Sequence, residues 1–418
     1  MNKDDANFKG IHSVVCVPGS KSLSQRALVA AALAQNDSII SNVLVSQDTM
    51  YLIGGLRALG AKIVSTQDGF FVSGTAGKII NSGEELFLGN NGTALRFLTA
   101  LVCLGRGKYT LTGEKRLCER PVGALVEALK EMGADILTHN NCPPMEINAN
   151  GLTGGKIILR DIESSQYVSA LLLCAPYTPE GMDLSLQGGV VSTPYINLTI
   201  AVMKDFGAKI TQTKKYEYHV NAGETYRGCE YHVEGDASSA SYFFLAAAIL
   251  RRTIRVTGIS RQSSQGDIRL LDVLEGLGCK VRSEENWVEV TGDNLAKGDF
   301  IFDLNDMPDM VPTLAILAAF RKGQTIIENV SHLRIKESNR LEALVAELNH
   351  AGIEAREMSE GIVIQGGKMQ PAKIETYNDH RMAMSFAIAG LVVRGIEISD
   401  KKCVDKSFPG FWEELKKI

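Results

Sequence analysis

The sequence predicts an α/β fold made of six copies of one strand–helix–strand–helix–hairpin unit. Three observations predict it: a recurring polar motif, an apolar helix-like run after each copy, and a glycine with the same period. The polar motif begins near residues 20, 90, 163, 235, 308 and 378, in steps of 70, 73, 72, 73 and 70 residues. A period of this length, containing strands and two helices, indicates a repeated small domain module.

The polar motif opens the first helix of each unit. Its copies are Pro-Gly-Ser-Lys-Ser, Asn-Asn-Gly-Thr, Glu-Ser-Ser-Gln, Gly-Asp-Ala-Ser-Ser, Pro-Asp-Met and Asn-Asp-His-Arg. Each precedes an apolar run such as residues 27–34 or 243–250. A helix N-terminus has unpaired N–H groups and a partial positive charge. Six of them directed at one place would bind a substrate that carries several anionic groups.

The second half of each unit is predicted to be a glycine-ended helix followed by two strands. Helix-like stretches such as residues 51–59 end at glycines, and a glycine directly after a helix is a common left-handed cap. These glycines are Gly60, Gly133, Gly207, Gly278 and Gly352. Residues 61–65 and 70–73 alternate around Asp68-Gly69, which predicts a hairpin. Duplication without functional meaning explains the period, but not why the polar motif stands at the same end of every unit.

Composition limits the possible classes of protein. A length of 418 residues suggests two or three domains, and 45% apolar with 22% charged residues is ordinary for a globular protein. The net charge of −4 and the lack of a basic stripe argue against nucleic-acid binding. The longest apolar runs, 242–250 and 313–320, are too short to cross a bilayer. Residues 1–10 are polar and show no secretory signal, so we expect a cytoplasmic protein.

Cysteine and histidine patterns do not indicate disulfides or a metal site. The eight cysteines are scattered without a C-x-x-C pair, which favours reduced thiols. The seven histidines show no metal-ligand spacing. Gly19-Ser20-Lys21-Ser22 is similar to the end of a nucleotide-binding P-loop, but Ser20 stands where that motif needs glycine.

Basic residues gather at the polar motifs and in the loops near them. They are Lys21, Arg26, Arg96, Arg120, Arg334, Lys336, Arg340, Arg381 and Lys406. Taken singly, each is as well explained as a solvated surface charge. Together with nearby serine and threonine hydroxyls they indicate a site for small polyanions that carry phosphate and carboxylate. Asp309 and Glu337 are then the acid–base candidates, although Asp309 is equally suited to cap a helix.

Six motifs in register resemble the 5-enolpyruvylshikimate-3-phosphate synthase family. They are Gly19-Ser20-Lys21-Ser22, Leu88-Gly89-Asn90-Asn91-Gly92-Thr93-Ala94, Glu119-Arg120-Pro121, Ser164-Ser165-Gln166, Arg334-Ile335-Lys336-Glu337-Ser338 and Asn378-Asp379-His380-Arg381-Met382-Ala383-Met384. The resemblance runs from about Val17 to the C-terminus. It implies transfer of the enolpyruvyl group of phosphoenolpyruvate to the 5-hydroxyl of shikimate 3-phosphate, a step of chorismate and aromatic amino-acid synthesis.

The resemblance also implies an architecture. The family has two inside-out α/β barrel domains of three βαβαββ units each, with helix N-termini facing an interdomain cleft. In this chain, residues 20–235 would form one domain, and residues 1–19 with 236–418 the other. The segment before residue 17 is short for the first hairpin of the family, so we expect the sixth unit to be shorter than the others. The resemblance implies no metal or organic cofactor, and we expect a monomer.

The site residues follow from the resemblance position by position. The implied ligands of shikimate 3-phosphate are Lys21, Ser22, Arg26, Ser164, Ser165, Gln166, Ser192, Tyr195, Asp309 and Lys336. The implied ligands of phosphoenolpyruvate are Lys21, Gly92, Arg120, Gln166, Arg340, Arg381 and Lys406. Glyphosate, the family's inhibitor, would occupy the phosphoenolpyruvate pocket. Gly92 fits this role because a backbone amide approaches phosphate closely only where no side chain intrudes.

The implied mechanism is addition followed by elimination through a tetrahedral intermediate. Asp309 is our candidate base toward the 5-hydroxyl and Glu337 our candidate proton carrier at C3, with Lys21 as a competitor for either task. Some positions depart from the family's common pattern without removing a catalytic group. They are Gln25, Asn91, Phe97 and Asn339.

Three alternatives remain open at this point. A related enzyme that transfers enolpyruvate to a UDP-sugar usually has an acidic group or cysteine five residues before its Arg-Pro pair, where this chain has Lys115. Cys118, two residues before Arg120, is interpreted as structural. An RNA 3'-phosphate cyclase would need a nucleotide site and a catalytic histidine, and neither pattern is visible. A non-catalytic repeat scaffold would spread its cations over outer faces.

Overall fold

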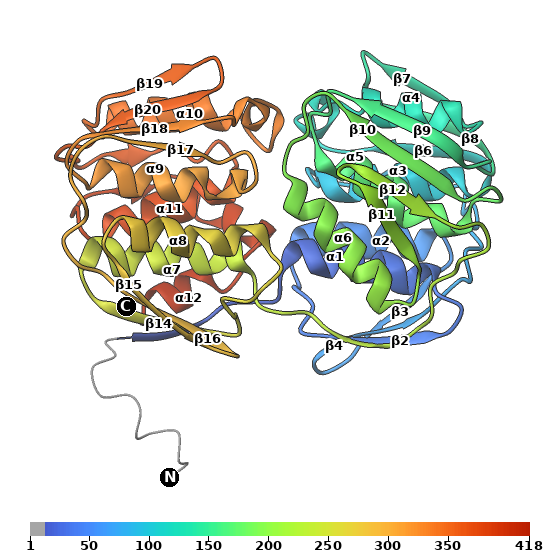
Figure 1. Ribbon diagram of the computed structural model, residues 1–418, viewed down its shortest axis with the longest axis horizontal. Helices are drawn as coiled ribbons and strands as arrows, with labels where there is room; N and C mark the ends of the chain where they lie inside the picture. Colours follow the sequence, from blue (N-terminus) through green and yellow to red (C-terminus); the bar gives the residue numbers. More distant parts are fainter. Residues whose placement is uncertain (1–12) are drawn as a thin grey trace, which may run out of the picture. The chain divides into compact units, whose positions relative to one another are not determined.

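The computed structural model describes residues 13–418 (Figure 1). They form a mixed α/β fold that divides into two compact units. Unit 1 contains residues 13–18, Glu234–Arg334 and Ser338–Ile418, and unit 2 contains Gly19–Val233 and Ile335–Glu337. The interpretation of residues 1–10 falls outside the described residues. Within residues 13–418, we find no helix with the length and hydropathy that a membrane span requires.

Two complete repeats of unit 2 show the predicted βαβαββ order. The elements of the first are β5 (Leu86–Phe87), α3 (Gly92–Cys103), β6 (Arg106–Thr112), α4 (Gly123–Glu131), β7 (Asp135–His139) and β8 (Cys142–Asn150). Those of the second are β9 (Gly155–Arg160), α5 (Ser165–Cys174), β10 (Met182–Gln187), α6 (Thr193–Asp205), β11 (Ile210–Lys214) and β12 (Glu217–Val220). Each repeat folds into one four-stranded sheet, β5-β6-β8-β7 or β9-β10-β12-β11. The first two strands are parallel and the two strands of the hairpin are antiparallel.

A third complete repeat lies in unit 1 and has the same strand order. Its elements are β17 (Phe300–Asp303), α9 (Val311–Ala319), β18 (Gln324–Glu328), α10 (Arg340–His350), β19 (Ala355–Met358) and β20 (Gly361–Gln365). The sheet order is β17-β18-β20-β19. A 3-10 turn, η5 (Pro308–Met310), precedes α9 and carries the fifth polar motif.

Two further repeats exchange their first strands. One consists of β1 (Ser13–Cys16), α1 (Lys21–Leu33), β2 (Asp37–Ser41), α2 (Gln47–Ala58), β3 (Lys62–Ser65) and β4 (Gly69–Ser73). The other consists of β13 (Glu230–His232), α7 (Ala237–Leu250), β14 (Thr253–Thr257), α8 (Leu270–Gly276), β15 (Lys280–Glu284) and β16 (Trp287–Thr291). Strand β1 pairs with β14 in unit 1, and β13 pairs with β2 in unit 2. Each of these two four-stranded sheets therefore includes a strand that lies just before a point where the chain passes from one unit to the other.

The sixth repeat is shorter. It consists of β21 (Lys373–Ile374), α11 (His380–Gly390) and β22 (Glu397–Ile398), and a 3-10 turn η7 (Lys402–Lys406) and α12 (Phe411–Leu415) follow it. Strands β21 and β22 form a two-stranded parallel sheet. In the described part of the chain no hairpin follows β22, in agreement with the expectation of a shorter sixth unit.

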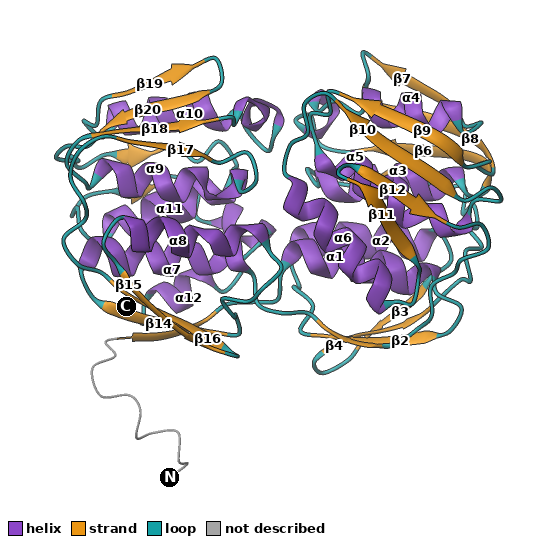
Figure 2. Ribbon diagram, in the orientation of Figure 1, coloured by secondary structure: helices purple, strands orange, loops and turns teal. Residues whose placement is uncertain are grey.

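Helices fill the inside of each unit and sheets form its outer walls (Figure 2). The first helix of each repeat is buried on almost every side, as an apolar sequence all round a helix predicts. The second helix is amphipathic; α4, for example, buries Leu125, Val126, Ala128 and Leu129. The polar motifs therefore begin helices whose bodies form the core of each unit.

The predicted glycine caps and hairpin are confirmed. The five periodic glycines have φ between +76° and +106°, a region that L side chains disfavour. Strands β3 and β4 pair antiparallel around Asp68, with Ser65 opposite Phe70. The period in the sequence therefore reports a repeat in the structure.

Candidate active site

Hydrogen-bonding side chains cap the polar helix starts of unit 2. The side chain of Ser20 caps α1, Asn91 caps α3 and Ser164 caps α5. Oδ1 of Asn91 accepts a 3.0 Å hydrogen bond from the Ala94 amide. Each cap satisfies one amide and leaves others of the first turn open. The prediction that these motifs begin helices is confirmed.

Four of the helix starts of unit 2, those of α1, α2, α3 and α5, are connected by hydrogen bonds. Nδ2 of Asn91 donates to Oε1 of Gln25 in α1 at 3.0 Å, and to the carbonyl of Asp48 in α2 at 2.6 Å. Nε2 of Gln166 in α5 donates to Oγ1 of Thr93 in α3 at 3.0 Å. The N-termini of α1, α2, α3 and α5 therefore meet at one place in this unit.

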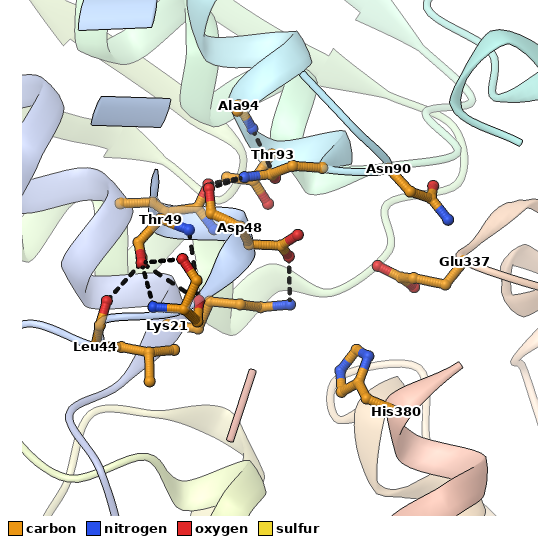
Figure 3. Close-up of polar contacts among 12 residues, drawn as sticks. Lys21, Leu44, Asp48, Thr49, Asn90, Thr93, Ala94, Glu337 and His380 are labelled. Atoms are coloured by element: carbon orange, nitrogen blue, oxygen red, sulfur yellow. Dashed lines mark hydrogen bonds and ion pairs between the residues drawn. The ribbon is translucent and has the colours of Figure 1, made fainter. Parts of the chain in front are cut away.

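Lys21 stands at this meeting point. Its ammonium lies 3.1 Å from Oδ2 of Asp48, which is buried in the first turn of α2 (Figure 3). A capping box formed by Ser46 and Thr49 fixes that turn. Sequence reasoning missed Asp48, although the Ser46-x-x-Thr49 spacing before an apolar run signals a helix start that places Asp48 beside the cap.

Two buried arginines flank Gly92 at the start of α3. Nη1 of Arg96 donates to the Gly92 carbonyl at 3.1 Å, and Nη1 of Arg120 donates to the Asn90 carbonyl at 3.4 Å. Burial lowers the pKa of Arg96 to about 10, and the charge of Arg120 acts in the same direction. Arg96 therefore remains a cation at neutral pH. Together with the dipole of α3 the two arginines create a strongly positive potential.

The segment Ile335–Glu337 belongs to unit 2 by its contacts. The carbonyl of Lys336 accepts a 3.1 Å hydrogen bond from Nε of Arg116. Oε1 of Glu337 lies 3.6 Å from Nη1 of Arg120, and its side chain is largely buried. A candidate proton carrier is thus held beside one of the two arginines.

The predicted shikimate-phosphate residues of unit 2 cluster around α1, α5 and α6. Ser164 and Ser165 are buried at the start of α5. Ser192 has φ of +57° before α6, and its buried hydroxyl has no hydrogen-bond partner among residues 13–418. A buried hydroxyl without a partner is costly, and a ligand oxygen would satisfy it.

Arg26 is more enclosed than a surface ligand would be. Its guanidinium donates to Oγ1 of Thr199 at 2.8 Å and to the carbonyls of Ser22 and Tyr195 at 2.9 and 3.2 Å. Burial lowers its pKa to about 10, so the guanidinium keeps its charge. Arg26 therefore joins Ser22 to the Tyr195 end of α6.

In unit 1, Asp309 lies between two arginines. Its Oδ1 accepts a 3.0 Å hydrogen bond from Nη1 of Arg340, and its Oδ2 accepts a 2.6 Å bond from Nη2 of Arg381. The N-cap of its turn is Met307. The alternative that the Asp309 carboxylate is a helix cap is therefore wrong, because that carboxylate binds guanidinium groups.

Asp379 holds the same arginine from its other side. Its Oδ2 accepts from Nε of Arg340 at 2.7 Å and from the hydroxyl of Ser338 at 3.0 Å. Asp379 also caps α11 through the Arg381 amide. Lys406 is buried in η7, which packs against α11. The sequence analysis identified the Asn-Asp-His-Arg motif but did not predict that its Asp379 forms an ion pair with Arg340.

The structure thus brings the predicted site residues together in two sets. Unit 2 holds Lys21, Ser22, Arg26, Gly92, Arg120, Ser164, Ser165, Gln166, Ser192, Tyr195, Lys336 and Glu337. Unit 1 holds Asp309, Arg340, Arg381 and Lys406. Every residue of both sets is buried or half-buried, whereas the scaffold alternative predicts cations spread over outer faces.

Comparisons with known proteins agree with this arrangement. The family model for EPSP synthase (3-phosphoshikimate 1-carboxyvinyltransferase) matches residues 7–415. A 3-phosphoshikimate 1-carboxyvinyltransferase of Trichormus variabilis is 42% identical over 412 residues, which cover 98% of this chain and 96% of the relative. One from Escherichia coli is 42% identical over 415 residues, with 98% and 96% covered.

A solved structure supports the fold. An EPSP synthase from Acinetobacter baumannii superposes with a TM-score of 0.79 at 26% sequence identity, covering 97% of this chain and 96% of that one. The predicted mixed α/β fold is confirmed by this similarity and by the five four-stranded sheets.

Proposed function

This chain belongs to the EPSP synthase family and has 3-phosphoshikimate 1-carboxyvinyltransferase activity in the shikimate pathway, and from that premise we propose how its residues divide the reaction. The hydrogen-bonded meeting of the α1, α3 and α5 N-termini around Lys21 carries the proposal. Such a cluster of helix starts and cations suits a ligand with phosphate and carboxylate groups.

Shikimate 3-phosphate would bind mainly at α1, α5 and α6. Ser164, Ser165 and Gln166 would contact it from the start of α5, and the unsatisfied hydroxyl of Ser192 supports a phosphate oxygen nearby. Further ligands would be Lys21, Ser22, Arg26, Tyr195, Asp309 and Lys336. The role of Arg26 would be to carry positive charge beneath the phosphate while holding Ser22 and Tyr195.

Phosphoenolpyruvate would bind where positive charge is densest. In unit 2 its ligands would be Lys21, Arg120, Gln166 and the Gly92 amide. In unit 1 they would be Arg340, Arg381 and Lys406. We therefore assign both units to one reaction. Electrostatic stabilisation of the departing phosphate by these cations needs no cofactor.

The chemistry would proceed by addition and elimination. Asp309 would accept the proton of the 5-hydroxyl, because Arg340 and Arg381 hold its carboxylate in place. The 5-oxygen would then attack C2 of phosphoenolpyruvate while Glu337 delivers a proton to C3. Loss of the C3 proton and of phosphate from the tetrahedral intermediate would form the product. Lys21 remains a competitor for either proton transfer.

We also propose that the chain has the domain architecture that family membership implies. Residues 20–235 would form one domain, and residues 1–19 with 236–418 the other, each an inside-out barrel of three units with its helix N-termini toward the substrates. Closure of the domains would exclude water from the reaction. The monomeric state and cytoplasmic location remain predictions.

Release of phosphate tests the assignment. Wild-type protein should release phosphate from phosphoenolpyruvate only when shikimate 3-phosphate is present. Asp309→Ala and Glu337→Gln should each lower kcat by about a hundredfold or more, with smaller changes in KM. Replacing an exposed carboxylate, as in Glu413→Gln, serves as the control. Normal turnover with raised KM in both site variants would contradict their catalytic roles.

A further inference from the structure

Asp267 is a buried carboxylate near Arg381 and is not among the predicted site residues. Asp267 belongs to the turn η4 (Gly266–Arg269) and is only 5% exposed. The preceding Gln265 fixes this turn, because its Oε1 accepts from the Ala237 amide at 3.2 Å and its Nε2 donates to the Gly235 carbonyl at 2.7 Å. Asp267 is thereby held against the first turn of α7.

A serine connects Asp267 to Arg381. The Ser238 hydroxyl donates a short hydrogen bond to Oδ2 of Asp267. Nη2 of Arg381 approaches the same hydroxyl oxygen at 3.4 Å and donates to Asp309 at 2.6 Å. A serine hydroxyl has one proton and two lone pairs. Because that proton is directed at Asp267, a lone pair is left for Arg381.

We propose that Asp267 is a positioning residue for Arg381, which it orients through the Ser238 hydroxyl, and that it takes up a proton when phosphoenolpyruvate binds. The inference rests on the proposed function, since it takes Arg381 as a ligand of phosphoenolpyruvate. Asp267 itself touches neither substrate in this scheme.

The charges around Asp267 support the proton uptake. It is faced by Asp236 at the start of α7, by Asp309 from η5 and by Arg381 from α11, and Arg381 also donates to the hydroxyl of Tyr242 at 3.4 Å. Burial raises the pKa of Asp267 to about 7, and the charge of Asp309 acts in the same direction. An anion bound at Arg381 would add negative charge and disfavour the ionised form of Asp267 further. Proton uptake and anion binding are therefore linked.

The sign of the pH dependence follows from this linkage. Below about pH 7 Asp267 is neutral, so the guanidinium of Arg381 lies near one negative charge fewer than at higher pH. As the pH rises through about 7, Asp267 ionises and weakens the attraction of this cluster for an anion. The kcat/KM for phosphoenolpyruvate should therefore fall in the wild type above that pH.

The test compares kcat/KM for phosphoenolpyruvate from about pH 6 to about pH 8 at saturating shikimate 3-phosphate. Asp267→Asn keeps an oxygen that accepts from Ser238 but cannot titrate. The ratio of wild-type to variant kcat/KM should fall about fivefold or more across this range. Titration of the substrate itself cancels in the ratio. Asp272→Asn, an exposed residue paired with Arg261, should follow the wild-type profile.

A second variant tests the positioning role. Ser238→Ala removes the connection and should raise KM for phosphoenolpyruvate about tenfold, with a smaller change in kcat. If Asp267→Asn shows the wild-type pH profile, or Ser238→Ala leaves KM within about twofold, the inference is overturned. An inactive wild type would instead contradict the proposed function, so the two failures are distinguishable. If Ser238→Ala does not fold, the Asp267→Asn profile decides.

Discussion

Nδ2 of Asn91 donates a 3.0 Å hydrogen bond to Oε1 of Gln25, and both residues are buried. The same amide reaches the Asp48 carbonyl at 2.6 Å. Asn91 thus forms one buried set of contacts that joins α1, α2 and α3. Asp48, which accepts from Asn91 through its carbonyl, also pairs with Lys21 through its carboxylate, so the same contact connects the start of α3 to Lys21.

We expect Asn91→Ala to destabilise the protein by about 2–4 kcal/mol. It removes the α3 cap, which costs about 1 kcal/mol, and leaves two buried acceptors without a donor. Asn91→Ser keeps a capping oxygen and should be about 1 kcal/mol less costly. Urea unfolding of both variants checks this order. Equal stability of the alanine variant and wild type would show that the contact contributes nothing.

Gly92→Ala should impair phosphoenolpyruvate binding without unfolding the protein. A Cβ at this position would lie 2.5 Å from Cζ of Arg120 and 2.6 Å from Nη1 of Arg96. Both arginines would have to move. We expect KM for phosphoenolpyruvate to rise about tenfold or more, with little change in KM for shikimate 3-phosphate. A rise in both constants alike would indicate general damage to α3 instead.

Asp379→Ala should be among the most destabilising single changes in unit 1. The side chain of Arg340 is 1% exposed and would keep Asp309 as a carboxylate partner while losing Asp379. Removing one partner of a buried ion pair costs about 3 kcal/mol or more. Ser338→Ala, which removes one hydrogen bond to the same carboxylate, should cost about 1–2 kcal/mol. Chemical denaturation compares the two, and a larger loss for the serine variant would refute this ranking.

Stability should depend on pH through Asp267. Its pKa is raised to about 7 from an unfolded value of 3.8, so the native state holds an additional proton between these values. Stability from this group is complete below about pH 4 and is lost as the pH rises to about 7. Unfolding free energies of wild type should therefore fall relative to Asp267→Asn over this interval and level off above it. A constant difference between the two proteins would contradict the raised pKa.

The repeat and its helix starts could be predicted because they depend on local chemistry. Ser20, Asn91 and Ser164 signal caps from their own sequence, and the periodic glycines signal helix ends. The buried carboxylates could not be predicted this way. Asp267 and Asp379 act on arginines 114 and 39 residues away in the chain, Arg381 and Arg340, and no local pattern records those pairings.

The exchange of strands β1 and β13 also has no local signal. Only the family resemblance implied it, because it assigned residues 1–19 and 236–418 to one domain and residues 20–235 to the other. Each strand looks like the first element of the repeat that follows it, yet pairs with a strand of the other repeat. Strand pairing over such separations depends on tertiary contacts rather than on local propensity. The repeat in the sequence predicted a first strand in each unit but carried no information on the partner of that strand.

The most direct test of the central claim is a crystal structure of the protein with shikimate 3-phosphate and an unreactive phosphoenolpyruvate mimic. We expect Lys21 and Arg120 of unit 2 and Arg381 of unit 1 all to lie within about 3.2 Å of the same bound mimic. A mimic held by the residues of one unit alone, with the arginine of the other still engaged only by protein carboxylates, would contradict it.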